Sequence, residues 1–225
     1  MLKLYFLRHG QTVLNVEERV QGWNDSPLTE LGIYQAKCTG YGLRDHIFTA
    51  AYCGDTGRQI KTAETFMAEN LNPVEIIPDH HFREMCYGKY QEGTYYNMLN
   101  QLFERVNGEY GGYEGLYKYY GDMEIGQLLC ESDETGAFEG PERTWFRVKE
   151  GIDILKDKYP EGDVLISTSS FVISDTVHHL FPGRIGKGLV ENASITVIGI
   201  ENNEFSLLDY NNTTYRKEGE EHFKQ

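Results

Sequence analysis

Three residues near the start of the chain combine side chains that could transfer a phosphoryl group. Arg8, His9 and Gly10 directly follow the apolar run from Leu2 to Leu7. A histidine can attack phosphorus while an adjacent arginine holds two phosphoryl oxygens, and a glycine lets the backbone approach a ligand closely. Taken alone, the triplet is more often a turn at a strand end, so the rest of the chain must decide between these interpretations.

The charge of the chain restricts the classes of molecule that it can bind. Its 225 residues include 35 Asp and Glu against 21 Lys and Arg, a net charge of -14, and more than half of the excess falls in residues 94–163. Such a chain lacks the basic surface that a nucleic-acid backbone needs. An anionic small molecule would need local cations, so each arginine beside a candidate site is informative.

The cysteine pattern and the N-terminal segment indicate the compartment. The four cysteines are Cys38, Cys53, Cys86 and Cys130, and none forms a C-x-x-C pair. This spacing favours free thiols in a reducing compartment. The apolar run from Leu4 to Leu7 is too short for a signal sequence or a membrane span. We therefore expect a cytoplasmic protein without a membrane or nucleic-acid partner, and a homodimer is compatible with the sequence.

Short apolar runs alternate with segments of helical periodicity along the chain. Strands are expected at residues 2–7, 50–53, 74–77 and 164–167, with a hairpin over 193–201 and 205–210 around Asn202 and Asn203. Helices are expected over 30–45, 57–69, 142–159 and 171–181. The alternation predicts one α/β domain over residues 1–225, with three α/β/α layers and a mainly parallel sheet. The polar tail from Asn211 is expected to fray.

The expected sheet also predicts where a ligand binds. In such sheets, ligands bind beyond the carboxyl ends of the strands. Four segments follow expected strands at that edge, namely residues 8–10, 54–58, 80–84 and 168–170. We therefore expect these four segments to line one crevice.

Residues 94–140 interrupt the alternation and are rich in tyrosine, glycine and acidic residues. We expect an insertion over the sheet edge that is helical around residues 98–106. Because it is long and follows a candidate site segment, it is predicted to be a lid that shapes the pocket. Its tyrosines are expected to pack within the lid rather than stack on nucleic-acid bases. A surface excursion or a contact between subunits is the alternative.

Four motifs occur in the order and spacing of a known family. They are RHGQTVLN at residues 8–15, QGWNDSPLTELGIYQA at 21–36, GDTGRQIKTAE at 54–64 and FREMCYGKYQEG at 82–93, and NASITVI at 192–198 fits the final strands. On these motifs the chain resembles the histidine phosphatase superfamily, which includes the phosphoglycerate mutases and many phosphatases. The resemblance covers most of the chain outside 94–140 and implies a phosphoglycerate mutase-like fold.

The resemblance also implies a role for each matching residue. His9 corresponds to the nucleophile that becomes a phosphohistidine, and Glu84 corresponds to the general acid that protonates the leaving alcohol and later activates water. The matching phosphate-pocket positions are Arg8, Arg58, Asn15, Gln21 and Gly22. Neither a metal nor another cofactor is implied, because the arginines and backbone donors stabilise the phosphoryl charge.

Within the family, the pattern is more similar to the phosphatases than to the glycolytic mutases. Residues 21–29 and 87–93 resemble broad-specificity phosphatases, whereas mutases usually carry a basic insertion that binds a second phosphate. Here the inserted residues 94–140 are acidic. We therefore expect a small phosphomonoester as the substrate.

One position departs from the family pattern. The family places a second histidine, followed by glycine, after the strand expected at 164–167, where this chain has Thr168 and Ser169. A threonine hydroxyl can donate a hydrogen bond to phosphate but carries no charge. The loss of one preorganised donor slows such reactions roughly a hundred- to a thousandfold.

The sequence leaves more than one function open. The first is a slow phosphatase that forms a phosphohistidine on His9, and the second is a catalytically impaired protein that binds a phosphorylated ligand or regulates another process. Glu84 favours the enzyme, because a binding protein needs no acid beside a leaving group. A zinc site of His80, His81 and Cys86 is less favoured, because adjacent histidines rarely bind one metal from a strand end.

Overall fold

A mixed sheet forms the centre of the molecule. The computed structural model of the 225-residue chain describes residues 1–105, 122–184 and 190–224, and within them six strands form one sheet in the order β3-β2-β4-β1-β5-β6. The strands are β1 Leu2–Arg8, β2 Ala50–Cys53, β3 Ile76–Pro78, β4 Gly162–Thr168, β5 Ile195–Glu201 and β6 Glu204–Asn212. The first four in the sheet order are parallel, β5 is antiparallel to β1, and β6 is antiparallel to β5. The predicted mainly parallel sheet is confirmed.

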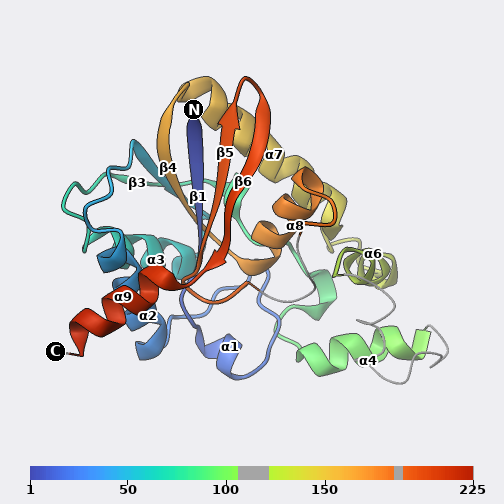
Figure 1. Ribbon diagram of the computed structural model, residues 1–225. Helices are drawn as coiled ribbons and strands as arrows, with labels where there is room; N and C mark the ends of the chain where they lie inside the picture. Colours follow the sequence, from blue (N-terminus) through green and yellow to red (C-terminus); the bar gives the residue numbers. More distant parts are fainter. Residues whose placement is uncertain (106–121, 185–189, 225) are drawn as a thin grey trace.

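Helices cover both faces of this sheet, as Figure 1 shows. One face carries α7 (Gly140–Lys158) and α8 (Ser170–Leu180), and the other carries α2 (Glu30–Gly42), α3 (Gly57–Met67) and α9 (Thr214–Phe223). Side chains of β1 alternate between the two cores, because Phe6 packs with Val148 and Val177 whereas Leu7 packs with Phe66. The strand is buried on both faces, so its sequence is a continuous apolar run. The predicted three-layer α/β/α architecture is confirmed.

Backbone hydrogen bonds align the carboxyl ends of three parallel strands. The register pairs Arg8 with Thr168, and the His9 N–H donates to the Thr168 carbonyl at 2.9 Å. Next to them, the Gly54 N–H donates to the carbonyl of Ser167 at 2.9 Å. The segments that follow β1, β2 and β4 therefore meet at one edge, as the strand order predicts.

The structure bears on the predicted hairpin around Asn202 and Asn203 and on the tail that was expected to fray. Asn202 and Asn203 connect β5 to β6 with positive φ angles of 52° and 65°, which is typical of a two-residue type I′ turn. The hairpin prediction is confirmed, but the prediction that the tail frays is wrong. Residues 214–223 form α9, in which Gly219 lies so close to Cys38 that a Cβ atom would lie 2.1 Å from its carbonyl oxygen. Because α9 packs here through backbone atoms at a glycine, the sequence of the tail shows no apolar periodicity that predicts this helix.

The described residues of the insertion form two helices and contribute to a separate apolar cluster. The short helices at this end of the molecule are α1 Val13–Val16, α4 Tyr95–Arg105, α6 Asp122–Ser132 and the 3₁₀ helices η1 His80–Phe82 and η2 Gly88–Tyr90. Met98 and Leu102 of α4 pack with Ile125 and Leu129 of α6 and with Met85. The helix predicted around residues 98–106 starts earlier, at Tyr95. Residue 106 and most tyrosines of the insertion lie outside the described residues.

Along the described segments, no helix is both long enough and apolar enough to cross a bilayer.

Candidate active site

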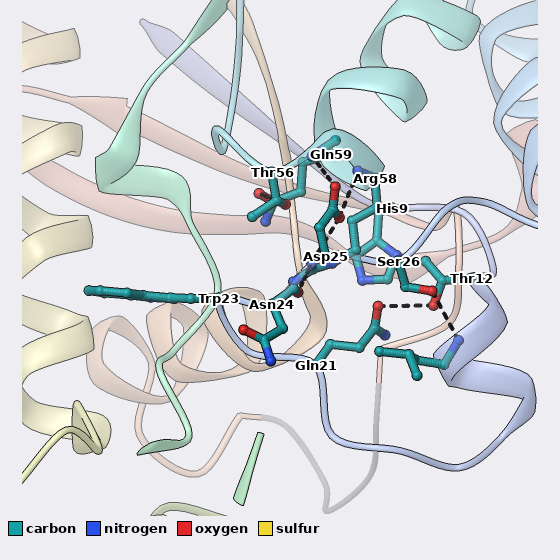
Figure 2. A network of polar contacts seen from close by, with 12 residues as sticks. His9, Thr12, Gln21, Trp23, Asn24, Asp25, Ser26, Thr56, Arg58 and Gln59 are labelled. Carbon is teal, nitrogen blue, oxygen red and sulfur yellow. Dashed lines mark hydrogen bonds and ion pairs between the residues drawn. The ribbon is translucent and has the colours of Figure 1, made fainter. Parts of the chain in front are cut away.

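A cavity of about 490 Å³ lies at the carboxyl edge of the parallel strands. Seven of the nine site residues expected from the sequence line it: Arg8, His9, Asn15, Gln21, Gly22, Arg58 and Glu84. Figure 2 shows His9 and Arg58 side by side, with the segment from Gln21 to Ser26 wrapped around them. The other two expected residues, Thr168 and Ser169, are not among the residues that line the cavity.

The position and tautomer of His9 follow from its hydrogen bonds. Its Nδ1 lies 2.8 Å from the carbonyl oxygen of Gly10. A carbonyl oxygen only accepts hydrogen bonds, so Nδ1 carries the proton and the lone pair of Nε2 is free. The backbone is held on both sides, because the His9 carbonyl also accepts from Nδ2 of Asn192 at 2.9 Å.

The environment of His9 keeps its ring neutral. The residue is 3% exposed. Burial, followed by the neighbouring charges of Arg58 and Arg8, holds the pKa of His9 well below its usual value. A neutral imidazole with a free Nε2 is the nucleophilic form of this side chain.

The glycine after His9 serves helix packing. A Cβ atom on Gly10 would lie 2.2 Å from the carbonyl oxygen of Gly32 in α2. Gly10 is therefore required because its backbone lies close to α2. The sequence had predicted that the backbone at Gly10 approaches a ligand. Its N–H donates to Oγ1 of Thr62 at 3.1 Å, which fixes the turn against α3.

Two arginines lie buried beside His9. Arg8 is 9% exposed and Arg58 is 1% exposed, and burial lowers the pKa of both guanidinium groups. Arg58 donates to the carbonyls of Asn24 at 2.8 Å and Gly22 at 2.7 Å, and Arg8 donates to the carbonyl of Val190. The Nε atoms of both arginines are buried without a hydrogen-bond partner in the described protein. An arginine stays protonated in proteins, so the guanidinium groups of these two cavity-lining residues can bind an oxyanion.

Asp25 fixes the loop that holds Arg58. One of its carboxylate oxygens accepts from the N–H of Gly57 at 2.7 Å, and the other accepts from the N–H of Arg58 at 3.2 Å. A carboxylate in this position satisfies free donors at the start of α3 and interacts favourably with the helix dipole. Figure 2 shows the resulting contact between Asp25 and Arg58.

Glu84 lies in the same cavity with its carboxylate at the start of α8. The residue is 8% exposed, and its carboxylate accepts hydrogen bonds from the backbone N–H groups of Met85, at 2.8 Å, and Phe171. Burial raises the pKa of Glu84 above its ordinary value, although these amides and the charges of Arg58 and Arg8 oppose the rise. A carboxyl group with a raised pKa is suited to donating a proton near neutral pH.

Arg147 of α7 fixes the segment that carries Glu84. Its guanidinium donates to both carboxylate oxygens of Glu139, at 2.7 and 2.8 Å. The same group also donates to the backbone carbonyls of His81, at 2.8 Å, and of Arg83, at 2.9 Å, and it reaches the carbonyl of Glu84 at 3.3 Å. Arg147 lies far from every motif in the sequence, so no sequence pattern indicates this contact.

Thr168 and Ser169 lie behind the cavity wall. The Thr168 hydroxyl donates to the carbonyl of Phe82 at 2.6 Å, and the Ser169 hydroxyl accepts from Nε2 of Gln59 at 2.9 Å. Both residues are fully buried. Thr168 ends β4 with its side chain towards Phe82, and this direction corrects the expectation that its hydroxyl faces the phosphate.

Ser170 reaches the cavity instead. It is the first residue of α8 and lines the cavity wall. Its hydroxyl oxygen accepts from the N–H of Val190 at 3.0 Å, which leaves its own proton available for donation to a ligand. Helix starts favour anionic ligands, and that position is the sequence signal that could have indicated Ser170.

The remaining wall of the cavity is divided into a polar and an apolar side. The polar side consists of Gln11, Asn15, Glu18, Gln21, Ser174 and Asn192. The apolar side consists of Met85, Tyr87, Tyr95, Met98, Ile125, Leu129 and Phe171. Much of the apolar side comes from α4 and α6, whose sequences match none of the motifs.

The histidines considered for zinc lie outside this cavity. Nδ1 of His81 is 2.6 Å from a carboxylate oxygen of Asp79, and candidate ligand atoms of Asp79, His80 and His81 lie within 4.8 Å of one another. Cys86 is not part of this group. All four cysteines belong to described segments and are free thiols, and burial raises the pKa of the Cys53 thiol to about 12.

The fold and the site define a class of protein. The family model of the histidine phosphatase superfamily (branch 1) matches residues 4–213. The chain belongs to this superfamily, as its motifs predict.

Particular relatives extend this assignment. The crystal structure of phosphoglycerate mutase from Bacillus anthracis str. Sterne superposes with a TM-score of 0.90 at 30% identity, over 97% of this chain and 96% of that chain. Probable phosphoglycerate mutase GpmB of Yersinia pestis (strain Pestoides F) is 36% identical over 88 residues, which are 39% of this chain and 40% of that protein. The chain thus matches less than half of the length of this curated relative. A phosphoserine phosphatase from Entamoeba histolytica shares the fold, with a TM-score of 0.69 at 22% identity over 96% of this chain and 99% of that chain.

Proposed function

We propose that the chain is a phosphatase that hydrolyses a small phosphomonoester through a phosphohistidine on His9. The observation that carries the proposal is that His9, whose Nδ1 donates to the Gly10 carbonyl, lines one cavity with the buried Arg8 and Arg58. Glu84 shares this cavity and has a raised pKa. Nucleophile, oxyanion donors and proton donor are the groups that phosphoryl transfer to histidine requires.

The first chemical step transfers the phosphoryl group to the enzyme. Nε2 of His9 attacks phosphorus and forms the P–N bond, while the bond between phosphorus and the ester oxygen breaks. Glu84 gives its proton to the departing alkoxide, so that a neutral alcohol leaves. Arg8 and Arg58 stabilise the charge on the phosphoryl oxygens, and Ser170 is placed to donate a further hydrogen bond.

The second step returns the enzyme to its starting state. The Glu84 carboxylate, now deprotonated, takes a proton from a water molecule that attacks phosphorus. The P–N bond breaks, inorganic phosphate forms, and His9 is again neutral with Nε2 free. Glu84 thus acts first as an acid and then as a base, and no other proton acceptor is needed.

A binding or regulatory protein on the same fold is the second candidate. Its support is the resemblance, which implies a charged donor at the position of Thr168, together with the hydrogen bonds that the Thr168 and Ser169 hydroxyls make to the protein. Glu84 supports the enzyme, because a binding protein needs no proton donor beside a leaving group. We therefore favour the phosphatase.

Turnover of an aryl phosphate tests this choice. Wild-type protein should release phosphate, and His9→Asn should reduce the rate to the uncatalysed level because the nucleophile is lost. His178→Asn is the matched control, since His178 is an exposed histidine of α8 and does not line the cavity. A wild-type protein without turnover that still binds phosphate would favour the binding protein.

A further inference from the structure

The cavity has few charges beyond those committed to the phosphoryl group. Among the described residues that line it, the arginines Arg8 and Arg58 are the cations, and both flank His9. The ionisable carboxyl groups in the lining are Glu18 and Glu84. A second phosphate or carboxylate on the substrate would therefore meet the carboxylate of Glu18 and no further cation among the described lining residues. The described part of the lining therefore favours a leaving group without a negative charge.

The opposite side of the cavity is apolar and already assembled. Met85, Met98, Ile125 and Leu129 are each 5% exposed or less, and they belong to the apolar cluster that α4 and α6 build. The aromatic ring of Phe171 lies against the same cluster. A ligand group placed here loses its hydration, and no reorganisation of the wall is needed to receive it.

We propose that this site selects phosphate monoesters of uncharged alcohols with an apolar body, aliphatic or aromatic, that lies on the wall formed by α4, α6 and Phe171. The proposal rests on the proposed function for the position of the phosphoryl group, and it adds the chemical class of the leaving alcohol. The volume of about 490 Å³ lies in the range of small-ligand pockets.

A homologous series of alkyl phosphates measures this preference. Primary alkyl phosphates from methyl to hexyl have nearly the same leaving-group chemistry and differ in apolar length. Because one buried methylene contributes about 0.8 kcal/mol, kcat/KM should rise about three- to fourfold for each added methylene until the wall is covered. 3-Phosphoglycerate should react no faster than methyl phosphate. A flat series, or faster turnover of 3-phosphoglycerate than of hexyl phosphate, would overturn the proposal.

Adjacent residues of α4 provide a matched pair of variants. Met98 and Leu99 are both 5% exposed and belong to the same cluster, but only Met98 lines the cavity. Met98→Gln should reduce the hexyl-to-methyl ratio of kcat/KM about tenfold, whereas Leu99→Gln should retain the wild-type ratio. Equal ratios in both variants, each verified as folded by thermal unfolding, would contradict the assigned wall.

Binding of alkylphosphonates separates this proposal from the proposed function. These compounds keep a phosphorus–carbon bond that the enzyme does not hydrolyse, so calorimetry measures affinity whether or not the protein is a phosphatase. Affinity should rise about fourfold for each methylene. A rising series with an inactive enzyme would retain the apolar site and reject the phosphatase. Turnover with affinity independent of chain length would retain the phosphatase and reject the apolar site.

Discussion

Burial moves the pKa values of His9 and Glu84 in opposite directions, because imidazole is charged when protonated and carboxyl is charged when deprotonated. The pKa of His9 is lowered, so its ring stays neutral at pH values below the ordinary range of histidine. The pKa of Glu84 is raised, so it keeps its proton at pH values above the ordinary range of a carboxyl group. One buried cavity therefore holds both groups in the forms that the first chemical step needs.

The pH dependence of kcat/KM should reflect this arrangement. After correction for ionisation of the substrate, kcat/KM should fall as the pH rises through the raised pKa of Glu84, because only the protonated acid can donate. Glu84→Gln should remove this alkaline limb and slow alkyl phosphates by about a hundredfold, with a smaller loss for aryl phosphates, whose leaving groups need less proton donation. An unchanged alkaline limb in the variant would assign it to another group.

Ser170 and Thr168 make different contributions, which two substitutions can separate. Ser170→Ala should reduce kcat/KM about tenfold, the value of one hydrogen bond to a charged group. Thr168→Val removes the hydrogen bond to the Phe82 carbonyl and should cost about 1–3 kcal/mol of unfolding free energy, with kcat/KM little changed. Steady-state kinetics and urea unfolding measure the two quantities. The reverse pattern would show that Thr168 contacts the ligand.

At the scale of elements, the sequence predicted the scaffold better than the walls of the site. Buried strands such as β1 and β2 were predictable because they are apolar runs that end at polar or glycine residues. The sequence singled out Thr168 and missed Ser170, since a strand becomes a helix between them and a shift of one residue reverses the direction of a side chain. Arg147 and Met98 reach the site from elements without a motif, so only tertiary contacts reveal them.

The contact of α7 with the segment before Glu84 has a measurable consequence. Arg147→Ala should reduce kcat/KM for alkyl phosphates by roughly ten- to a hundredfold, because a displaced Glu84 donates its proton poorly. Aryl phosphates should lose less, and Arg147→Lys should restore part of the alkyl rate. Arg143→Ala is the matched control, because Arg143 is an exposed residue of the same helix. Equal losses on alkyl and aryl substrates would make Arg147 a residue of general stability only.

At the scale of the whole molecule, a net charge of -14 surrounds a cavity that holds two buried arginines. Their neighbouring positive charges repel each other and are partly desolvated, so the empty cavity destabilises the fold locally. An oxyanion would relieve both effects. Bound phosphate is therefore expected to lie in this cavity, beside the two arginines.

Phosphate should therefore stabilise the folded protein. At a concentration of phosphate or vanadate 100-fold above its Kd, the unfolding free energy should increase by about 2.7 kcal/mol, seen as a higher Tm. Arg58→Gln should abolish most of this increase. Sodium chloride at the same ionic strength is the control. An equal rise with chloride, or a full rise in Arg58→Gln, would indicate a general salt effect.

Trapping of the phosphoenzyme tests the central claim most directly. Brief incubation with a ³²P-labelled phosphomonoester, followed by an alkaline quench and peptide mapping, should place an acid-labile and base-stable label on His9. The same label should be present in His178→Asn and absent from His9→Asn. Two results would contradict the account. One is an active wild-type protein with the label on another residue, and the other is a label that persists in His9→Asn.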